Sequence, residues 1–338
     1  MKASSQRIEL VEQLRGLAAL AVAWFHLTNG YSDWVASTGS HGWLGVEVFF
    51  VVSGMVIPLS LVIDWHQRGL RAIPLFLVRR AVRIEPPYLF SVLLVVALNS
   101  LAMRAPGFQG QMQTYPAEQV LLHAAYLIPF SPHEWLQPVY WTLAFEFAFY
   151  IAVASMIGVV DQMRQKYFLG LVALVLALVV AGKSSPLVAL FVMGCVVFRA
   201  RASLTPLWLA GLGLLACVAA MSLAGAAAQS LIGLMTAVVL LSERHIAPLA
   251  ARIPLLGNLG ALSFSLYLLH VPIGGKIVNL GRRWLTSPLE HLLLSGLALA
   301  GSLLAAYCLW RWVERPCIAA SRRLAYAWRD RAEQPGAT

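Results

Sequence analysis

The sequence predicts an all-α, polytopic membrane protein with about ten transmembrane helices, and three observations support this fold class. Hydrophobic residues make up 59% of the 338 residues and charged residues only 12%, whereas an ordinary soluble domain carries about a quarter charged residues. The apolar residues gather in runs of roughly membrane-spanning length, and open strands would leave backbone groups unpaired in lipid. Positive residues concentrate in alternate connecting segments, as cytoplasmic loops do.

The expected spans are bounded by charges or by Gly and Pro clusters. They fall at about 14–30, 43–63, 86–103, 138–160, 167–182, 186–199, 204–223, 229–242, 256–275 and 289–310. A further apolar run, 120–130, is too short to cross and is interrupted by proline, so we expect a short re-entrant or interfacial segment there. One membrane domain over 1–325 therefore takes up nearly all of the chain, followed by a tail over 326–338.

The distribution of positive charge predicts the topology. With ten crossings and the N-terminus inside, 20 of the 25 Lys and Arg residues fall in cytoplasmic segments. The other five fall outside: Arg104, Lys183, Lys276, Arg282 and Arg283. We expect both termini to be cytoplasmic, in a bacterial inner membrane, with residues 104–137 as the main extracytoplasmic segment. The first run lacks small residues at a cleavage position, so we expect a retained helix.

Charge and cysteine usage exclude two other classes of protein. The net charge of +10 is scattered between apolar runs rather than gathered on one polar face, so no nucleic-acid partner is expected. The four cysteines show neither CxxC spacing nor a paired extracellular pattern, so we expect no disulfide and no metal.

Ionisable residues within apolar runs are the candidates for chemistry, because they are costly in lipid. Arg15 and His26 are eleven residues apart, which is about 16 Å of helical rise on one stripe. Glu146 falls at about the same depth as His26 if its helix enters near residue 138. A carboxylate beside an imidazole fixes the tautomer and leaves the other ring nitrogen as a base. The alternative is a packing histidine and a structural acid.

Three further residues in the apolar runs are weaker candidates for substrate binding. His270 and Glu47 lie near the outer ends of their helices, where they either line a vestibule or snorkel to the interface. Ser53 lies near the midplane of its helix beside Gly54, and small residues there often permit close helix packing.

A cluster of arginines precedes the third expected span. Arg79, Arg80 and Arg83 come shortly before Pro86. Three guanidinium groups this close can hold the phosphates of an acyl-CoA or a nucleotide. The alternative is a topology signal with no ligand.

Six motifs in a fixed order carry a resemblance to a known family. They are Arg15-Gly16-Leu17-Ala18 followed by His26, segment 45–54 with Glu47 and Ser53, segment 79–88, Trp141-Thr142-Leu143 followed by Glu146 and Tyr150, segment 265–270 ending at His270, and Glu314-Arg315-Pro316. From about residue 7 to residue 325 the chain resembles the acyltransferase-3 family of membrane-bound acyltransferases. The resemblance implies a ten-helix enzyme that transfers an acyl group, usually acetyl, from cytoplasmic acyl-CoA to a hydroxyl of a carbohydrate or lipid-linked sugar.

The resemblance also implies roles for individual residues. His26 is the essential histidine and Glu146 its acidic partner, Arg15 lies in the same channel, and Arg80 and Arg83 belong to the donor side with acetyl-CoA as co-substrate. The fused hydrolase-like domain of some members is absent from these motifs, which implies that one module performs the whole transfer.

Several alternatives stay open at this stage. His26 either removes a proton from the acceptor hydroxyl or carries the acyl group itself. A proton-linked carrier or flippase of glycolipid intermediates is the second hypothesis, and a structural subunit of an export complex is the third. The acceptor, the acyl group and the formation of a homodimer are also open.

Overall fold

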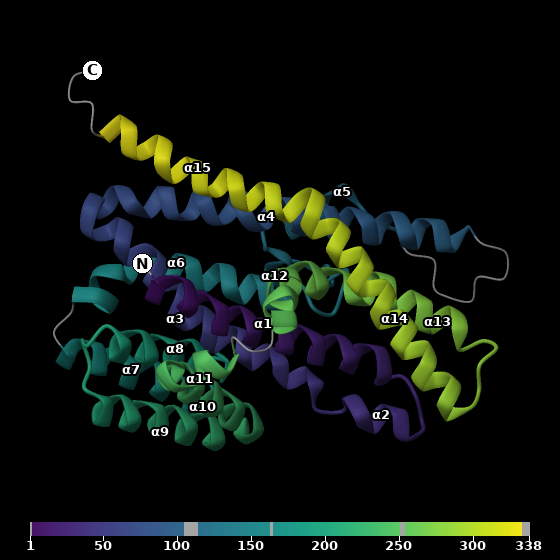
Figure 1. Ribbon diagram of the computed structural model, residues 1–338, viewed down its shortest axis with the longest axis horizontal. Coiled ribbons are helices and arrows are strands. Elements are labelled where there is room, and N and C mark those ends of the chain that lie inside the picture. Colours follow the sequence, from purple (N-terminus) through teal and green to yellow (C-terminus); the bar gives the residue numbers. More distant parts are fainter. Residues whose placement is uncertain (1, 105–113, 163–164, 251–253, 333–338) are drawn as a thin grey trace. The chain divides into compact units, whose positions relative to one another are not determined.

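The computed structural model describes residues 2–104, 114–162, 165–250 and 254–332. Every regular element within these ranges is a helix (Figure 1), so the predicted all-α class is confirmed for the described part of the chain. The expected tail, 326–338, is described only as far as residue 332, and residues 105–113 of the expected outer segment also lie outside the described residues.

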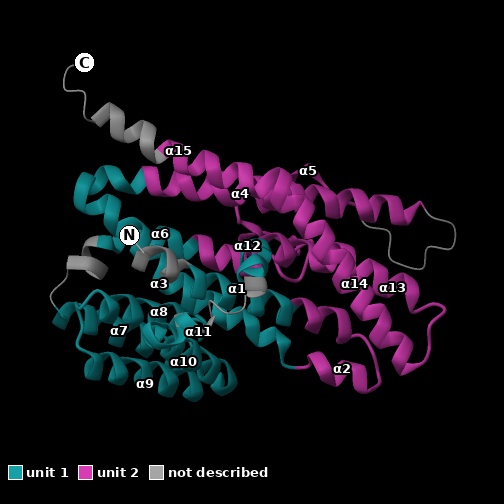
Figure 2. Cartoon of the chain, viewed as in Figure 1, with its two compact units in different colours: residues 1–22, 41–74, 148–263 teal, residues 23–40, 75–147, 264–338 magenta. Residues whose placement is uncertain are grey.

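The chain divides into two compact units, which Figure 2 distinguishes by colour. Unit 1 comprises Met1–Val22, His41–Pro74 and Ala148–Ser263, and unit 2 comprises Ala23–Ser40, Leu75–Phe147 and Phe264–Thr338.

Unit 1 contains the first part of α1 and most of the short apolar helices. Its elements are α1 (Lys2–Thr28), η1 (Gly42–Leu44), α3 (Gly45–Arg68), η2 (Gly69–Arg71), most of α6 (Trp141–Gln162), α7 (Gln165–Val180), α8 (Val188–Arg201), α9 (Leu207–Leu223), α10 (Ala227–Leu241), α11 (Glu243–Ala250) and the beginning of α12 (Pro254–Leu269).

Unit 2 contains the end of α1 and the C-terminal helices. Its other elements are α2 (Trp34–Gly39), α4 (Ala72–Met103) from Leu75 onward, α5 (Ala117–Ala124), η3 (Ile128–Phe130), the beginning of α6, the end of α12, the π-helix η4 (His270–Gly275), α13 (Lys276–Gly281), α14 (Pro288–Leu309), the π-helix η5 (Trp310–Glu314) and α15 (Arg315–Ala332).

Three helical stretches in the described residues are long and apolar enough to cross a membrane. They are Trp34–Met103, Gly257–Gly281 and Pro288–Leu324, and shorter apolar helices occur at Trp141–Ile157, Gln165–Val180, Leu207–Leu223 and Ala227–Leu241. The count of about ten crossings stays a prediction. The segment expected to be re-entrant or interfacial forms α5 and η3, and its place in the membrane also stays a prediction.

Within unit 1, two glycines let α3 and α8 approach each other closely. A Cβ atom added at Gly54 would meet the Phe191 carbonyl oxygen and lie 2.9 Å from Gly194 Cα. The rings of Phe50 and Phe191 stack beside this contact with centroids 4.7 Å apart. Because lipid gives no hydrophobic force between helices, such close packing of small residues is what holds them together. This supports the packing interpretation of the Ser53-Gly54 pair.

The expected boundaries of the third span were wrong. The apolar run predicts a helix from about residue 86, with the arginines in a loop before it, but α4 begins at Ala72 and continues through Pro86 and Pro87. Arginine is a good helix former, so a charged stretch ends an apolar run without ending the helix. Arg79, Arg80 and Arg83 therefore lie within a helix, where positions i, i+1 and i+4 lie close to one another.

Candidate functional site

Two of the predicted site residues, His26 and His270, lie in direct contact. His26 is near the C-terminal end of α1, and His270 is the first residue of η4 and is fully buried. The Nδ1 atom of His26 lies 3.3 Å from Nε2 of His270, and the two rings are tilted by 55° with centroids 5.1 Å apart. Sequence analysis predicted both residues but did not pair them.

The hydrogen bonds determine which nitrogen of each ring carries the proton. Nδ1 of His270 lies 3.0 Å from the Leu266 carbonyl oxygen, which can only accept, so this nitrogen is the protonated one. In a neutral His270 ring, Nε2 then holds a lone pair and accepts a hydrogen bond from Nδ1–H of His26. Neutral His26 is left with a lone pair on Nε2. A backbone carbonyl, relayed through His270, thus prepares His26 Nε2 to act as a base.

The π-helix explains why His270 can come so close to α1. Pro272 has no N–H to donate to the helix, and Gly274 follows it. A Cβ atom at Gly274 would lie 2.7 Å from Cδ2 of Leu27, the residue after His26. The absence of a side chain at Gly274 therefore allows η4 to pack against the end of α1. Single π turns are frequent at functional sites, and Pro272 with Gly274 is the only sequence signal that pointed to an irregular helix here.

The helix that carries Glu146 is tied to α12 near the histidine pair. The hydroxyl oxygens of Thr142 and Tyr267 are 2.8 Å apart, and both residues are buried. Trp141 and Glu146 lie half-buried in the first turns of α6, within the same unit as His26. The predicted contact between Glu146 and His26 stays a prediction.

The arginine cluster of α4 lies in unit 2 as well. Arg80 extends over the ring of Phe76, with Cζ 5.5 Å from the centroid. The hydroxyl of Ser321 donates to the carbonyl oxygen of Arg79 at 3.0 Å, which ties α15 to this part of α4. The structure thus places the arginines on a helix anchored by the C-terminal helix, and their role as donor-binding residues stays a prediction.

The remaining predicted residues belong to unit 1. They are Arg15 in α1, Glu47 and Ser53 in α3, and Tyr150 in α6. Glu47 is only 2% exposed, and its Oε2 atom has no hydrogen-bond partner in the described structure. The described residues contain no group of three or more His, Cys, Asp or Glu side chains that could hold a metal ion.

Comparison with known proteins identifies the family. A family model described as an acyltransferase domain matches residues 8–310, which is most of the chain. The chain belongs to the acyltransferase-3 family. This membership and the apolar helices make it an integral membrane protein of an acyltransferase family.

One curated relative of this acyltransferase-family chain is peptidoglycan O-acetyltransferase OatA of Listeria monocytogenes serovar 1/2a (strain ATCC BAA-679 / EGD-e). The two are 29% identical over 93 residues, which is 28% of this chain and 14% of that protein. The chain therefore matches only a small part of the relative's length. No solved structure matches the chain significantly.

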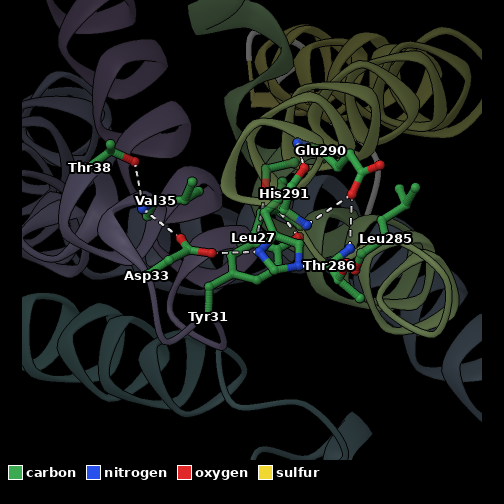
Figure 3. A network of polar contacts seen from close by, with 11 residues as sticks. Leu27, Tyr31, Asp33, Val35, Thr38, Leu285, Thr286, Glu290 and His291 are labelled. Carbon is green, nitrogen blue, oxygen red and sulfur yellow. Dashed lines mark hydrogen bonds and ion pairs between the residues drawn. The ribbon is translucent and has the colours of Figure 1, made fainter.

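In this acyltransferase-family chain, a polar clasp fixes the end of α1 next to His26 (Figure 3). The Tyr31 ring stacks on His291 of α14 with centroids 4.3 Å apart and planes 20° apart. Nδ1 of His291 lies 2.6 Å from Oδ2 of Asp33, and Nε2 lies 3.1 Å from the Leu285 carbonyl oxygen. One turn further along α14, Ser295 donates to the Leu27 carbonyl oxygen at 3.3 Å. The α14 helix therefore holds the chain on both sides of the α1 terminus.

The clasp needs a positively charged imidazole. Both ring nitrogens of His291 face acceptors that cannot donate, an ionised carboxylate and a carbonyl, so each nitrogen must carry a proton. The hydrogen bond from His291 holds the pKa of Asp33 below its usual range. Asp33 also caps α2 by accepting from the Val35 backbone N–H at 2.8 Å.

A second histidine stabilises the outer segment in the neutral form. Nδ1–H of His123 in α5 donates to the Gln119 carbonyl oxygen at 2.8 Å, and Nε2 accepts from the Leu136 backbone N–H at 3.1 Å. Burial lowers the pKa of His123, because the charged ring would be desolvated and Nε2 could no longer accept. His123 thus ties α5 to the chain that leads into α6, and sequence analysis gave no role to it.

Proposed function

We propose that this protein is an O-acyltransferase that moves an acetyl group from cytoplasmic acetyl-CoA to a hydroxyl of a carbohydrate or lipid-linked sugar. The observation that carries the proposal is the hydrogen bond between His26 and His270, which leaves His26 Nε2 as a base inside a helical membrane domain. Family membership supports acyl transfer.

The histidine pair suits a direct transfer. His26 Nε2 removes the proton of the acceptor hydroxyl while the hydroxyl oxygen attacks the carbonyl carbon of the thioester. The carbon–sulfur bond then breaks, and the imidazolium returns its proton to the leaving thiolate. His270 accepts from the His26 Nδ1–H throughout and stabilises the positive charge that develops on the His26 ring. We propose Glu146 as a second acid that stabilises the same charge.

The arginines of α4 are the proposed site for coenzyme A. Arg79, Arg80 and Arg83 lie close together on the helix, so their guanidinium groups can contact the same phosphates. The pantetheine arm would reach from these phosphates toward Arg15 and His26. This arrangement requires the arginines on the cytoplasmic side of a bacterial inner membrane, which the positive-inside distribution supports.

A carbohydrate acceptor is supported by the relative, whose name states that it acetylates peptidoglycan. The candidate residues for acceptor binding are Glu47, Ser53, Trp141, Tyr150 and His270. The contact with His26 gives His270 a further role, because it orients the base as well as lining the site.

The test uses the purified protein in lipid nanodiscs with acetyl-CoA labelled in the acetyl group. Wild-type protein should release free coenzyme A thiol and produce labelled acceptor, and His26→Ala should lose both. The exposed His66 at the end of α3 provides a matched control, so His66→Ala should retain activity. Full acylation by His26→Ala would overturn the proposal, and transport of glycolipid without thiol release would favour a carrier.

A further inference from the structure

Lys276 is held in a defined position at the start of α13. Its side chain is half-buried, and Nζ donates to Oδ1 of Asn99 in α4 at 2.7 Å. The amide of Asn99 in turn donates through Nδ2 to the Tyr115 hydroxyl at 2.9 Å. Because Tyr115 fixes the orientation of the amide, its oxygen always faces the lysine. Two neutral residues thus hold an ammonium group in one place.

This ammonium group has no carboxylate partner among the described residues. An ammonium carries three N–H donors, and the described structure provides one acceptor, Asn99. The sequence between His270 and Leu289 contains no acidic residue but does contain Arg282 and Arg283, both exposed. A partly buried cation without a counter-ion is unfavourable, so an anion bound there would be stabilised by both the charge and the free donors.

The position of Lys276 connects it to the histidine pair. It follows His270 by six residues along one helical run, which is at most about 9 Å of rise. Asn99 lies near the end of α4, and Tyr115 precedes α5, so both of the residues that orient Lys276 border the segment expected to shape acceptor choice. An acceptor whose hydroxyl reaches His26 can therefore extend a second group to Lys276.

We propose that Lys276 is a specificity residue that binds an anionic group of the acceptor, a carboxylate or a phosphate close to the hydroxyl that is acylated. The inference rests on the proposed function and narrows its substrate class to acidic sugars or sugar phosphates. The anion could also come from a lipid headgroup, so the experiment separates the two sources.

The experiment compares two probes that differ in one group, methyl β-glucoside and methyl β-glucuronide. The melting temperature of the protein is measured in phosphatidylcholine nanodiscs with each probe, because a ligand of the folded state raises it whether or not acylation follows. Methyl glucuronide should stabilise wild-type protein at roughly tenfold lower concentration than methyl glucoside. Lys276→Met should lose this preference, and Lys276→Arg should retain it.

The exposed Lys183 between α7 and α8 provides a matched control, so Lys183→Met should keep the preference of the wild type. His26→Ala should also keep it while losing thiol release, which separates failure of acceptor recognition from failure of the proposed chemistry. Equal effects of the two probes on wild-type protein, or an unchanged preference in Lys276→Met, would overturn the inference. Stabilisation by phosphatidylglycerol nanodiscs that depends on Lys276, with no preference for glucuronide, would assign the site to lipid and also overturn it.

Discussion

Replacing His270 by asparagine or glutamine separates its effect on the base from its effect on packing. The oxygen or nitrogen of an asparagine side chain occupies the place of Nδ1, so His270→Asn leaves Nδ1–H of His26 without its acceptor. The side-chain oxygen of a glutamine can occupy the place of Nε2, so His270→Gln keeps an acceptor for His26. Both variants leave a polar side chain in a fully buried position.

The size of the effect follows from the charge on His26 during the reaction. A hydrogen bond to a charged group contributes about 1.5–3 kcal/mol, and the His26 ring is charged only while it holds the acceptor's proton. The bond therefore stabilises the transition state more than the ground state, and its loss should lower kcat by roughly 10- to 150-fold. The KM for the acceptor should change little, because the ground state is less affected.

The assay is steady-state release of coenzyme A thiol by purified variants in nanodiscs, with melting temperatures to confirm that each variant is folded. We expect His270→Asn to lose kcat and His270→Gln to recover most of it. If the two variants lose activity equally while both stay folded, His270 acts by packing and the tautomer argument is wrong.

Three further predictions concern stability, each measured by the melting temperature in nanodiscs. Gly54→Ala should destabilise unit 1 by about 1–3 kcal/mol because the new methyl group overlaps α8, whereas Gly170→Ala, where a Cβ meets nothing within 4 Å, should change little; equal effects would contradict the packing account. Burial lowers the pKa of His123, so its contribution is present above about pH 6.5 and is lost as the pH falls through the lowered value; His123→Gln, which keeps an acceptor, should weaken this acid sensitivity, and an unchanged pH profile would refute the assignment. The hydrogen bond from His291 lowers the pKa of Asp33, so Asp33→Asn should melt below the wild type at pH 7 and approach it as the pH falls through that lowered value; the same difference at every pH would exclude the clasp as its cause.

The membrane fold could be predicted from composition, because hydrophobic runs and positive loops follow directly from the properties of lipid. Individual boundaries were less accurate where a helix extends beyond its apolar part. The helix that carries Arg79 starts at Ala72 rather than near residue 86, and α1 starts at Lys2 rather than near residue 14. Hydropathy reports where a helix meets lipid, whereas backbone hydrogen bonds determine where the helix begins.

The same distinction explains what was missed at the site. His26 stood out because it is ionisable within an apolar run, but its depth was counted from the first apolar residue. That count favoured Glu146 as its partner and placed His270 nearer the outer surface. The contact with His270 joins residues 244 positions apart and depends on the π-helix, whose extra residue per turn no periodicity argument anticipated.

The π-helix η4 also determines how the two ends of the proposed site are phased. A π turn accommodates about one residue more than an α turn, so deleting a single residue from His270–Gly275 would let the segment relax into a regular α-helix. Everything after the deletion would then rotate by roughly 100° relative to what precedes it. His270 would keep its place beside His26, while Lys276 would swing away from Asn99. Sequence variation in this one turn could therefore alter which acceptors are selected without touching the proton-transfer pair.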